Sequence, residues 1–547
     1  MTPPTGRYVL LATILGSSMA FIDGSALNVV LSVLQVDLGA SGAQLVWVVN
    51  AYLLMLASLI LIGGSLGDNY GRNRVFGAGI AIFAGASVAC GLAPSAGVLI
   101  AARAVQGIGG ALMVPGSLAI ITANFHGDSR GPAIGIWSSF STITTVGGPV
   151  LGGLLGDVGL WRGVFFINVP LALVALWALR RVPETRSEDA SGQIDIPGAA
   201  CVTLGLAGLT YGLVTLGDLG PQAGLRDPGV IGALIVGVAA LIAFVVIERR
   251  VAHPMVDLTL FRSRAFSGAN LMTAFLYGAL SGGLLFLPLN LIQVQGYGPG
   301  QAGLVMLPFA GLLAILSPWA GRWGARVGPR VPLTIGPALV ALGFVALALP
   351  GITAGASEYW TTYLPGIVLL GAGMGITVAP LTSTVMGAVP ERNAGIASGI
   401  NNAVTRSSQA LMTGVFGAVA LVLFASTLQT NAAAVLPPAA ADALVAGAGD
   451  LAATAIPDSL SPELAEVAQN AIHESFVQVF QVLMVVCAGL CFASAVFSAA
   501  ILRGTRRGAG RGRGIRVKED GQPASRSRCR TYRRQRTERA LDGHRRQ

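Results

Sequence analysis

Charged side chains are rare inside the long apolar runs of this 547-residue chain, and those present are the first candidates for chemistry. Asp23 lies fifteen residues into a run that begins at Tyr8, and Arg103 lies five residues into a run that begins at Val98. If both runs are helices that cross a membrane in opposite directions, a rise of about 1.5 Å per residue places both side chains in its outer half. A charge buried in a membrane is costly, so we expect these two to pair.

A buried carboxylate beside an arginine can take part in proton transfer. It changes between its ionised and protonated forms when the local field changes, which is what a proton-coupled carrier requires. We therefore predict that Asp23 and Arg103 form a proton-coupling pair. The alternative is a static ion pair with a structural role.

Three further polar residues, Asn28, Gln106 and Arg406, are predicted to face a substrate cavity. Gln106 follows Arg103 by three residues and so shares its helix face. Asn28 follows Asp23 by five residues, about 140° round a helix, so the two cannot both point squarely into the cavity. Arg406 is the one charge inside the last six apolar runs. It indicates either an anionic or polar group on the substrate or a hydrogen-bonded packing role.

Composition identifies the environment of these residues. Hydrophobic residues make up 53% of the chain and charged residues 11%, whereas soluble proteins carry about a quarter charged residues. The sequence therefore predicts an all-α polytopic membrane protein that sits in a lipid bilayer. The 74 glycines agree with this class, because small residues let helices pack closely in lipid.

About fourteen apolar runs are long enough to cross a bilayer. They lie near 8–31, 45–62, 75–92, 98–121, 133–155, 164–179, 196–216, 230–247, 267–292, 301–320, 331–349, 362–380, 394–424 and 476–502. If the N-terminus is cytoplasmic, the inner loops hold fourteen arginines and the outer loops hold only Arg162 and Arg226. This segregation follows the positive-inside rule, so both termini are predicted to be cytoplasmic.

The pattern divides the chain into four parts. These are a six-helix bundle at 1–181, a linker with two inserted helices at 182–250, a second six-helix bundle at 251–502 that includes a long outer loop at 425–474, and a tail at 503–547. The tail carries a net charge of +12, which leaves −2 for the rest of the chain. We expect this tail to lie in the cytoplasm, against anionic lipid headgroups or disordered, and we expect no nucleic-acid binding. The outer loop is predicted to be a linker or a lid.

The segment 64–76, between the second and third runs, is predicted to be a hinge loop at the cytoplasmic surface. Asp68 can accept hydrogen bonds from a helix N-terminus, and Arg72 marks the cytoplasmic side. Three glycines remove Cβ atoms where backbones approach or φ turns positive; they are Gly64, Gly67 and Gly71. The segment is therefore a candidate gating loop.

The glycine spacing of this segment recurs at 321–328, after the second of the last six runs. Internal repetition of this kind predicts two parallel six-helix halves. Carriers built in this way bind substrate near the midplane of the membrane and alternate access by rocking around it.

Two of these segments resemble motifs of the major facilitator superfamily. Its signature G-x-L-x-D-x-x-G-R, between helices 2 and 3, is carried here by Gly64, Leu66, Asp68, Gly71 and Arg72. The segment that starts at Arg103 is similar to the helix-4 motif R-x-x-Q-G-x-G-x-A, whose arginine is associated with proton transfer. The resemblance implies a fold of two six-helix halves plus an inserted central pair, and a coupling role for Arg103.

The fifth run resembles the motif that marks exporters rather than importers within the superfamily. Thr144 stands where its leading glycine is usual, and the rest is carried by Gly148, Pro149, Gly152 and Gly153. The alternative is a generic packing face of small residues. Next comes Trp161–Pro170, WRGVFFINVP, which is similar to the start of helix 6 in the fourteen-helix drug:proton antiporter family. Asp23 and Asn28 match part of the helix-1 motif of the same family.

The resemblance implies a secondary active transporter rather than an enzyme. It would export hydrophobic or amphipathic small molecules, such as drugs, antibiotics or antiseptics, in exchange for protons and by alternating access. We expect a multi-pass protein of the bacterial cytoplasmic membrane that works as a monomer. No catalytic residue, metal site or cofactor is predicted, and the proton gradient supplies the energy.

Two other classes of function stay open. One is an importer or exporter of a specific metabolite, although the fifth-run motif argues against import. The other is a sensor that keeps the fold but does not transport, and such a protein would not need Asp23.

Overall fold

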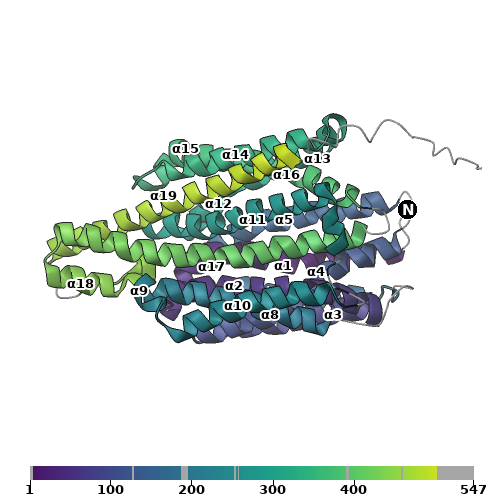
Figure 1. The fold of residues 1–547 in the computed structure, drawn as a ribbon, viewed down its shortest axis with the longest axis horizontal. Helices are drawn as coiled ribbons and strands as arrows, with labels where there is room; N and C mark the ends of the chain where they lie inside the picture. Colours follow the sequence, from purple (N-terminus) through teal and green to yellow (C-terminus); the bar gives the residue numbers. More distant parts are fainter. Residues whose placement is uncertain are drawn as a thin grey trace, which may run out of the picture. The chain divides into compact units, whose positions relative to one another are not determined.

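The protein is a bundle of helices (Figure 1). The structure, a computed structural model, describes residues 4–125, 129–186, 195–251, 254, 256, 258–389, 394–457 and 460–501. Within these ranges no strand is present, and the prediction of an all-α fold is confirmed. The predicted basic tail at 503–547 lies outside the described residues.

The helices follow the order expected from the apolar runs. The first part of the chain forms α1 (Pro4–Leu38), α2 (Gly42–Tyr70), α3 (Arg72–Gly91), α4 (Ala96–Asn124), α5 (Arg130–Asp157), α6 (Gly163–Phe166) and α7 (Asn168–Leu179). The centre forms α8 (Ile196–Leu219), α9 (Pro221–Gly224) and α10 (Pro228–Glu248). The last part forms η2 (Leu258–Arg262), α11 (Arg264–Leu289), η3 (Asn290–Val294), α12 (Pro299–Val305), α13 (Leu307–Val327), α14 (Arg330–Ala348), η4 (Gly355–Glu358), α15 (Tyr359–Thr362), α16 (Leu364–Gly387), α17 (Ala394–Val435), α18 (Pro438–Ala446), η6 (Ala448–Ala453) and α19 (Pro462–Ile501).

Twelve helices among the described residues are long and apolar enough to cross a membrane. The predicted fifth and sixth spans are occupied by α5 and by the shorter apolar segment Gly163–Leu179, which is interrupted between α6 and α7. Helices thus stand at each of the predicted positions, and the chain is a multi-pass membrane protein.

The central pair, α8 and α10, packs along the seam between the two halves. The two helices contact each other, and α8 also contacts α2 and α17, so it touches one helix from each half. Close approach within the pair depends on Gly208, where a Cβ would lie 2.8 Å from the carbonyl oxygen of Ala233. Only three residues of α10 are buried, and the rest are exposed or half-buried, as expected for a helix that faces lipid.

The predicted hinge loop at 64–76 is wrong in its extent. α2 continues as a helix to Tyr70 and α3 begins at Arg72, so the connection is the single residue Gly71. Gly71 has φ of 112°, a conformation that favours glycine, and Gly328 has φ of 86° at the matching place between α13 and α14. Gly64 and Asp68 lie on α2 itself. The glycine repeat therefore marks the same sharp turn in both halves.

The sequence suggested that Asp68 caps the N-terminus of the third helix, but in the structure it does not. Its carboxylate accepts from the guanidinium of Arg72 at 2.7 Å, across the turn. The N-terminus of α3 is capped by Glu184, which follows α7 and accepts from the backbone N–H groups of Asn73, at 2.9 Å, and Arg74, at 3.2 Å. A carboxylate more than a hundred residues away fills this role because α7 ends beside the start of α3.

The predicted outer loop at 425–474 is also mostly helical. α17 extends to Val435 and α19 begins at Pro462, so both continue past their apolar runs, and α18 and η6 lie between them. Ser461 caps the N-terminus of α19, since its Oγ accepts from Leu464 N–H at 3.4 Å.

Candidate functional site

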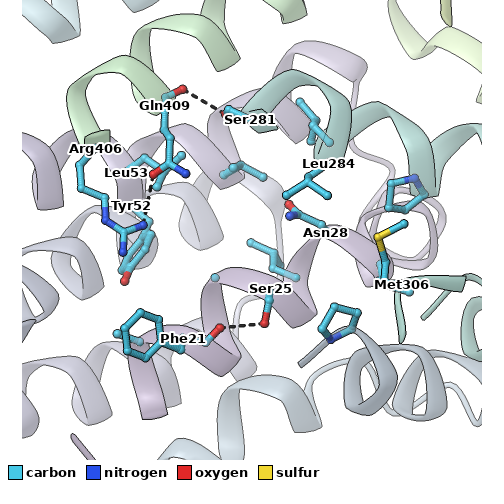
Figure 2. A pocket seen from close by; sticks show the side chains of 18 of the residues that line it. Phe21, Ser25, Asn28, Tyr52, Leu53, Ser281, Leu284, Met306, Arg406 and Gln409 are labelled. Atoms are coloured by element: carbon cyan, nitrogen blue, oxygen red, sulfur yellow. Dashed lines mark hydrogen bonds between the residues drawn. The ribbon is translucent and has the colours of Figure 1, made fainter. Parts of the chain in front are cut away.

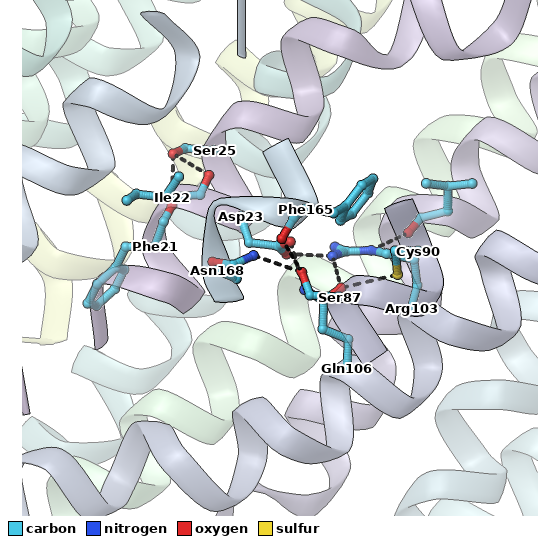
Figure 3. A network of polar contacts seen from close by, with 11 residues as sticks. Phe21, Ile22, Asp23, Ser25, Ser87, Cys90, Arg103, Gln106, Phe165 and Asn168 are labelled. Atoms are coloured by element: carbon cyan, nitrogen blue, oxygen red, sulfur yellow. Dashed lines mark hydrogen bonds and ion pairs between the residues drawn. The ribbon is translucent and has the colours of Figure 1, made fainter. Parts of the chain in front are cut away.

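The two buried charges of the N-terminal half meet. Asp23 on α1 and Arg103 on α4 form an ion pair between Asp23 Oδ2 and Arg103 Nη1 (Figure 3). The two side chains are 0% and 1% exposed, respectively. The structure thus brings together the pair that the sequence singled out, and its role in proton coupling stays a prediction.

Gln106 completes the pair from the same face of α4. Its Oε1 accepts from Arg103 Nη1 at 2.7 Å, and its Nε2 donates to Asp23 Oδ1 at 2.8 Å. Arg103 Nε also donates to the carbonyl of Val48, on α2, at 3.2 Å. Each carboxylate oxygen therefore has a donor, and the guanidinium has three acceptors, which offsets the cost of burying both charges.

Gln106 was predicted to line the cavity, but its side chain points between α4 and α3 instead. It is fully buried, and Cys90 Sγ on α3 donates to its Oε1 at 3.6 Å. The longer side chain of Arg103 reaches both the ion pair and the cavity wall, whereas Gln106 reaches only the ion pair. Its position indicates that it holds Asp23 and Arg103 in place.

Two residues of this site were not predicted. Ser87 Oγ, on α3, donates to the carbonyl of Phe165 at 2.8 Å, and Asn168 Nδ2 donates to Ser87 Oγ at 2.9 Å. Gln106 Nε2 lies 3.4 Å from the same Ser87 oxygen, which joins these residues to the ion pair. Asn168 belongs to the motif Trp161–Pro170, so its signal was an amide inside an apolar segment. We call Asp23, Arg103, Gln106, Ser87 and Asn168 the buried network.

A cavity of about 220 Å³ lies beside the buried network (Figure 2). Both halves form its wall, through α1, α2, α4 and α5 on one side and α11, α13 and α17 on the other. Asn28 and Arg406 line it, as do Arg103 and Tyr52, whose ring lies 4.4 Å from the guanidinium carbon of Arg103. Asp23 faces the buried network instead, consistent with the 140° that separates it from Asn28 on a helix.

The glycines of α5 serve contacts with two different helices. A Cβ at Gly152 would lie 2.5 Å from the carbonyl oxygen of Ala26 on α1, and one at Gly148 would overlap Ser25 Oγ on the same helix. A Cβ at Gly153 would instead overlap the carbonyl oxygen of Pro299 on α12. Pro149 lines the cavity. The motif thus packs α5 on its own half through one face and on the other half through another.

The two halves are joined at the end of the bundle where α1 ends and α2 begins, which we call the distal end. Gln293 Nε2 donates to Gln35 Oε1 at 2.8 Å, and Gln35 Nε2 donates to the carbonyl of Asp450, in η6, at 3.0 Å. The N–H of Gly300 donates to Asp157 Oδ1 at 2.9 Å. These hydrogen bonds hold the two halves together at the distal end.

The comparison to known families agrees with the fold and with the sequence motifs described above. The family model described as Major Facilitator Superfamily matches residues 13–413. The chain belongs to the major facilitator superfamily. Its similarity to curated proteins agrees with the drug antiporter branch that the motifs resemble, and it places the chain among membrane transporters of small molecules rather than among enzymes.

Among the relatives within this superfamily, the multidrug resistance protein Stp of Mycobacterium tuberculosis (strain CDC 1551 / Oshkosh) is 36% identical over 437 residues, which cover 79% of each chain. The tetracenomycin C resistance and export protein of Streptomyces glaucescens is 32% identical over 82% of this chain and 81% of its own. The cephamycin export protein CmcT of Amycolatopsis lactamdurans is 33% identical over 82% of this chain and 90% of its own.

Solved structures show the same superfamily fold. A bacterial homolog of the human lysosomal transporter Spinster, in an inward-facing and unoccupied conformation, aligns with a TM-score of 0.62 at 20% identity and covers 91% of this chain and 98% of its own. The nucleoside transporter NupG aligns with a TM-score of 0.56 at 13% identity and covers 91% of this chain and all of its own.

Proposed function

We propose that this chain exports amphipathic small molecules in exchange for protons, by alternating access. The observation that carries the proposal is the buried Asp23–Arg103 pair, whose arginine also lines the cavity. The names of the relatives, which refer to multidrug resistance and to antibiotic export, support a drug or antibiotic as cargo.

Arg103 is the physical link between proton and cargo. Protonation of Asp23 removes the negative charge that holds the guanidinium, so Arg103 gains freedom to turn toward acceptors in the cavity. Because Arg103 and Tyr52 both lie in the cavity wall, a change in Asp23 alters both the field and the shape that a cargo molecule meets. A coupling free energy between the two binding events is what antiport requires.

The proposed topology puts the protein in the bacterial cytoplasmic membrane with both termini in the cytoplasm. The distal end, where the halves are joined by hydrogen bonds, then faces outward, and cargo would enter the cavity from the cytoplasm. The cavity is smaller than the about 300–1,000 Å³ of most small-molecule sites, so a bulky cargo requires the halves to part. The Gly71 and Gly328 turns would hold the cytoplasmic ends of the spans during this rocking, in a protein that works as a monomer.

The proposal is tested with inverted membrane vesicles that carry the protein and maintain an imposed proton gradient. Uptake of a panel of dyes and antibiotics is compared for the parent, Asp23→Asn and Asp37→Asn. Asp37 is a matched control, because it lies on the same helix but is 45% exposed and pairs with Arg162 at the surface.

We expect the parent and Asp37→Asn to accumulate at least one compound and Asp23→Asn to lose gradient-driven accumulation, with equal amounts of folded protein in all three. Accumulation that persists unchanged in Asp23→Asn would contradict the coupling role. A parent that accumulates nothing would contradict export.

A further inference from the structure

The two arginines of the cavity wall differ in the acceptors that their guanidinium groups contact. Arg103 is surrounded by the carboxylate of Asp23, the amide of Gln106 and the carbonyl of Val48. Arg406, on α17, donates through Nη1 to the neutral Gln409 Oε1 at 3.2 Å, which is the polar contact seen for it within the described chain (Figure 2). A guanidinium carries five N–H donors. Most of those on Arg406 are therefore left for a ligand.

No acid balances Arg406 in the cavity wall. Among the described residues that line the cavity, the charged ones are Arg103 and Arg406. Asp23 is already bound to Arg103 and does not line the cavity. An unpaired cation in a membrane interior is costly, and a bound anion lowers that cost. The cavity thus carries a net positive charge that favours anions and disfavours cations.

The rest of the wall is suited to an apolar body. Phe21, Leu284, Met306 and Phe309 line the same cavity as Arg406. The hydroxyl of Ser281 is occupied, since it donates to the carbonyl of Gln409 at 3.2 Å. A ligand that matches this wall has apolar rings that contact these side chains and one acidic group that reaches the guanidinium.

We propose that Arg406 binds the anionic group of the exported molecule, so that amphipathic anions such as aromatic sulfonates and carboxylates are the preferred cargo. This inference rests on the proposed function, because it names the substrate class of the same cavity. A planar guanidinium binds such groups through two parallel hydrogen bonds, which an ammonium does not reproduce.

A pair of fluorescent probes isolates the anionic group. 8-Anilinonaphthalene-1-sulfonate and N-phenyl-1-naphthylamine share the same rings and differ by the sulfonate. Their binding to purified protein in nanodiscs is measured by equilibrium dialysis, with empty nanodiscs to subtract partition into lipid. The variants are Arg406→Gln, Arg406→Lys and Arg322→Gln. Arg322→Gln is the matched control, because it removes an exposed arginine of α13 that does not line the cavity.

We expect the parent and Arg322→Gln to bind the sulfonate more tightly than the neutral probe. Arg406→Gln should weaken binding of the sulfonate by about tenfold or more and leave the neutral probe within about twofold, and Arg406→Lys should fall between. Equal affinity of the parent for both probes, or an equal loss of both probes in Arg406→Gln, would overturn the anion site. Equal loss is the result for a residue that only packs.

Binding in nanodiscs does not depend on transport, so failure of this inference and failure of the proposed function are separate results. If the parent pumps the neutral probe into inverted vesicles but shows no preference for the sulfonate, export is supported and the anion site is contradicted. If the parent prefers the sulfonate in nanodiscs but moves neither probe in vesicles, the anion site is supported and export is contradicted.

Discussion

At the scale of single residues, the site depends on a carboxylate whose two oxygens are both used. Asp23 Oδ2 contacts Arg103 and Oδ1 accepts from Gln106, in surroundings closed to solvent. Such an arrangement holds a charge only while every partner is present, because an unpaired buried acceptor costs about 1–3 kcal/mol. Gln106 is therefore a positioning residue, since it touches both members of the ion pair and not the cavity.

We predict that Gln106→Met distinguishes a positioning role of Gln106 from a purely structural one. Methionine is close in volume but cannot donate to Asp23 or accept from Arg103, so the unfolding free energy should fall by about 1–3 kcal/mol. Gradient-driven uptake should also fall, because Asp23 and Arg103 lose the amide that holds both of them in place. Stability is measured by thermal melting in detergent, and uptake is measured in inverted vesicles.

Gln481→Met is the control, since Gln481 is half-buried and donates to the carbonyl of Pro350, away from the buried network. It should lose stability and keep the uptake rate of the parent. If Gln106→Met also keeps that uptake rate, the role of Gln106 is structural only.

At the scale of elements, the glycines of α5 separate contacts within a half from contacts between halves. Gly152 meets α1 of its own half, so its contact persists in every conformation of a rocking carrier. Gly153 meets Pro299 on α12 of the other half at the closed distal end. A methyl group added there should disfavour only the conformation that is closed at this end.

We predict that Gly153→Ala shifts the protein toward opening at the distal end. Overpacking typically costs about 1–3 kcal/mol, so the population of the open state relative to the closed state should rise by about 5- to 150-fold. The readout is labelling of Asn28→Cys, in the cavity wall, by a membrane-impermeant maleimide added outside intact cells. Gly147→Ala is the matched control on the same helix, because nothing lies within 4 Å of a Cβ at Gly147.

Labelling should rise in Gly153→Ala and stay at the parent rate in Gly147→Ala. Equal rates in the two alanine variants would show that the α5–α12 contact does not control the distal end.

At the scale of the whole molecule, the apolar runs and their arginines fix which ends of the helices lie together. Three features could be predicted, each from a local pattern. Hydropathy gives the order of the helices, glycine spacing gives the repeated turn at Gly71 and Gly328, and helix rise gives the meeting of Asp23 with Arg103. The Glu184 cap, the links through Ser87 and Asn168, and the direction of Gln106 could not be predicted. Each depends on contacts between distant segments, which no local pattern encodes.

The lengths of the connections were predicted poorly for a related reason. A run of apolar residues ends where the span leaves the bilayer, whereas the helix itself can continue beyond that point. Polar or small residues in the segments 64–70 and 425–435 were therefore assigned to loops, although α2 and α17 continue through them.

The predicted topology can be checked with cysteine labels on opposite ends of the bundle. Ala439→Cys, on α18, should react with an impermeant maleimide in intact cells, and Arg326→Cys, near the end of α13, should react only in inverted vesicles. Both positions are exposed, and Cys201→Ser removes the one partly exposed cysteine among the described residues. Reaction of both positions from the same side would contradict the proposed topology.

The central claim is that Asp23 couples cargo movement to protons, and the most direct test is proton movement itself. Purified protein is placed in liposomes in weak buffer, with the membrane potential clamped by potassium and valinomycin. A pH electrode then follows the medium after 8-anilinonaphthalene-1-sulfonate is added outside. We predict that the medium acidifies as the probe enters in exchange for protons, that Asp37→Asn does the same, and that Asp23→Asn gives no acidification. Probe entry without proton release in the parent, or equal proton release in Asp23→Asn, would contradict the account.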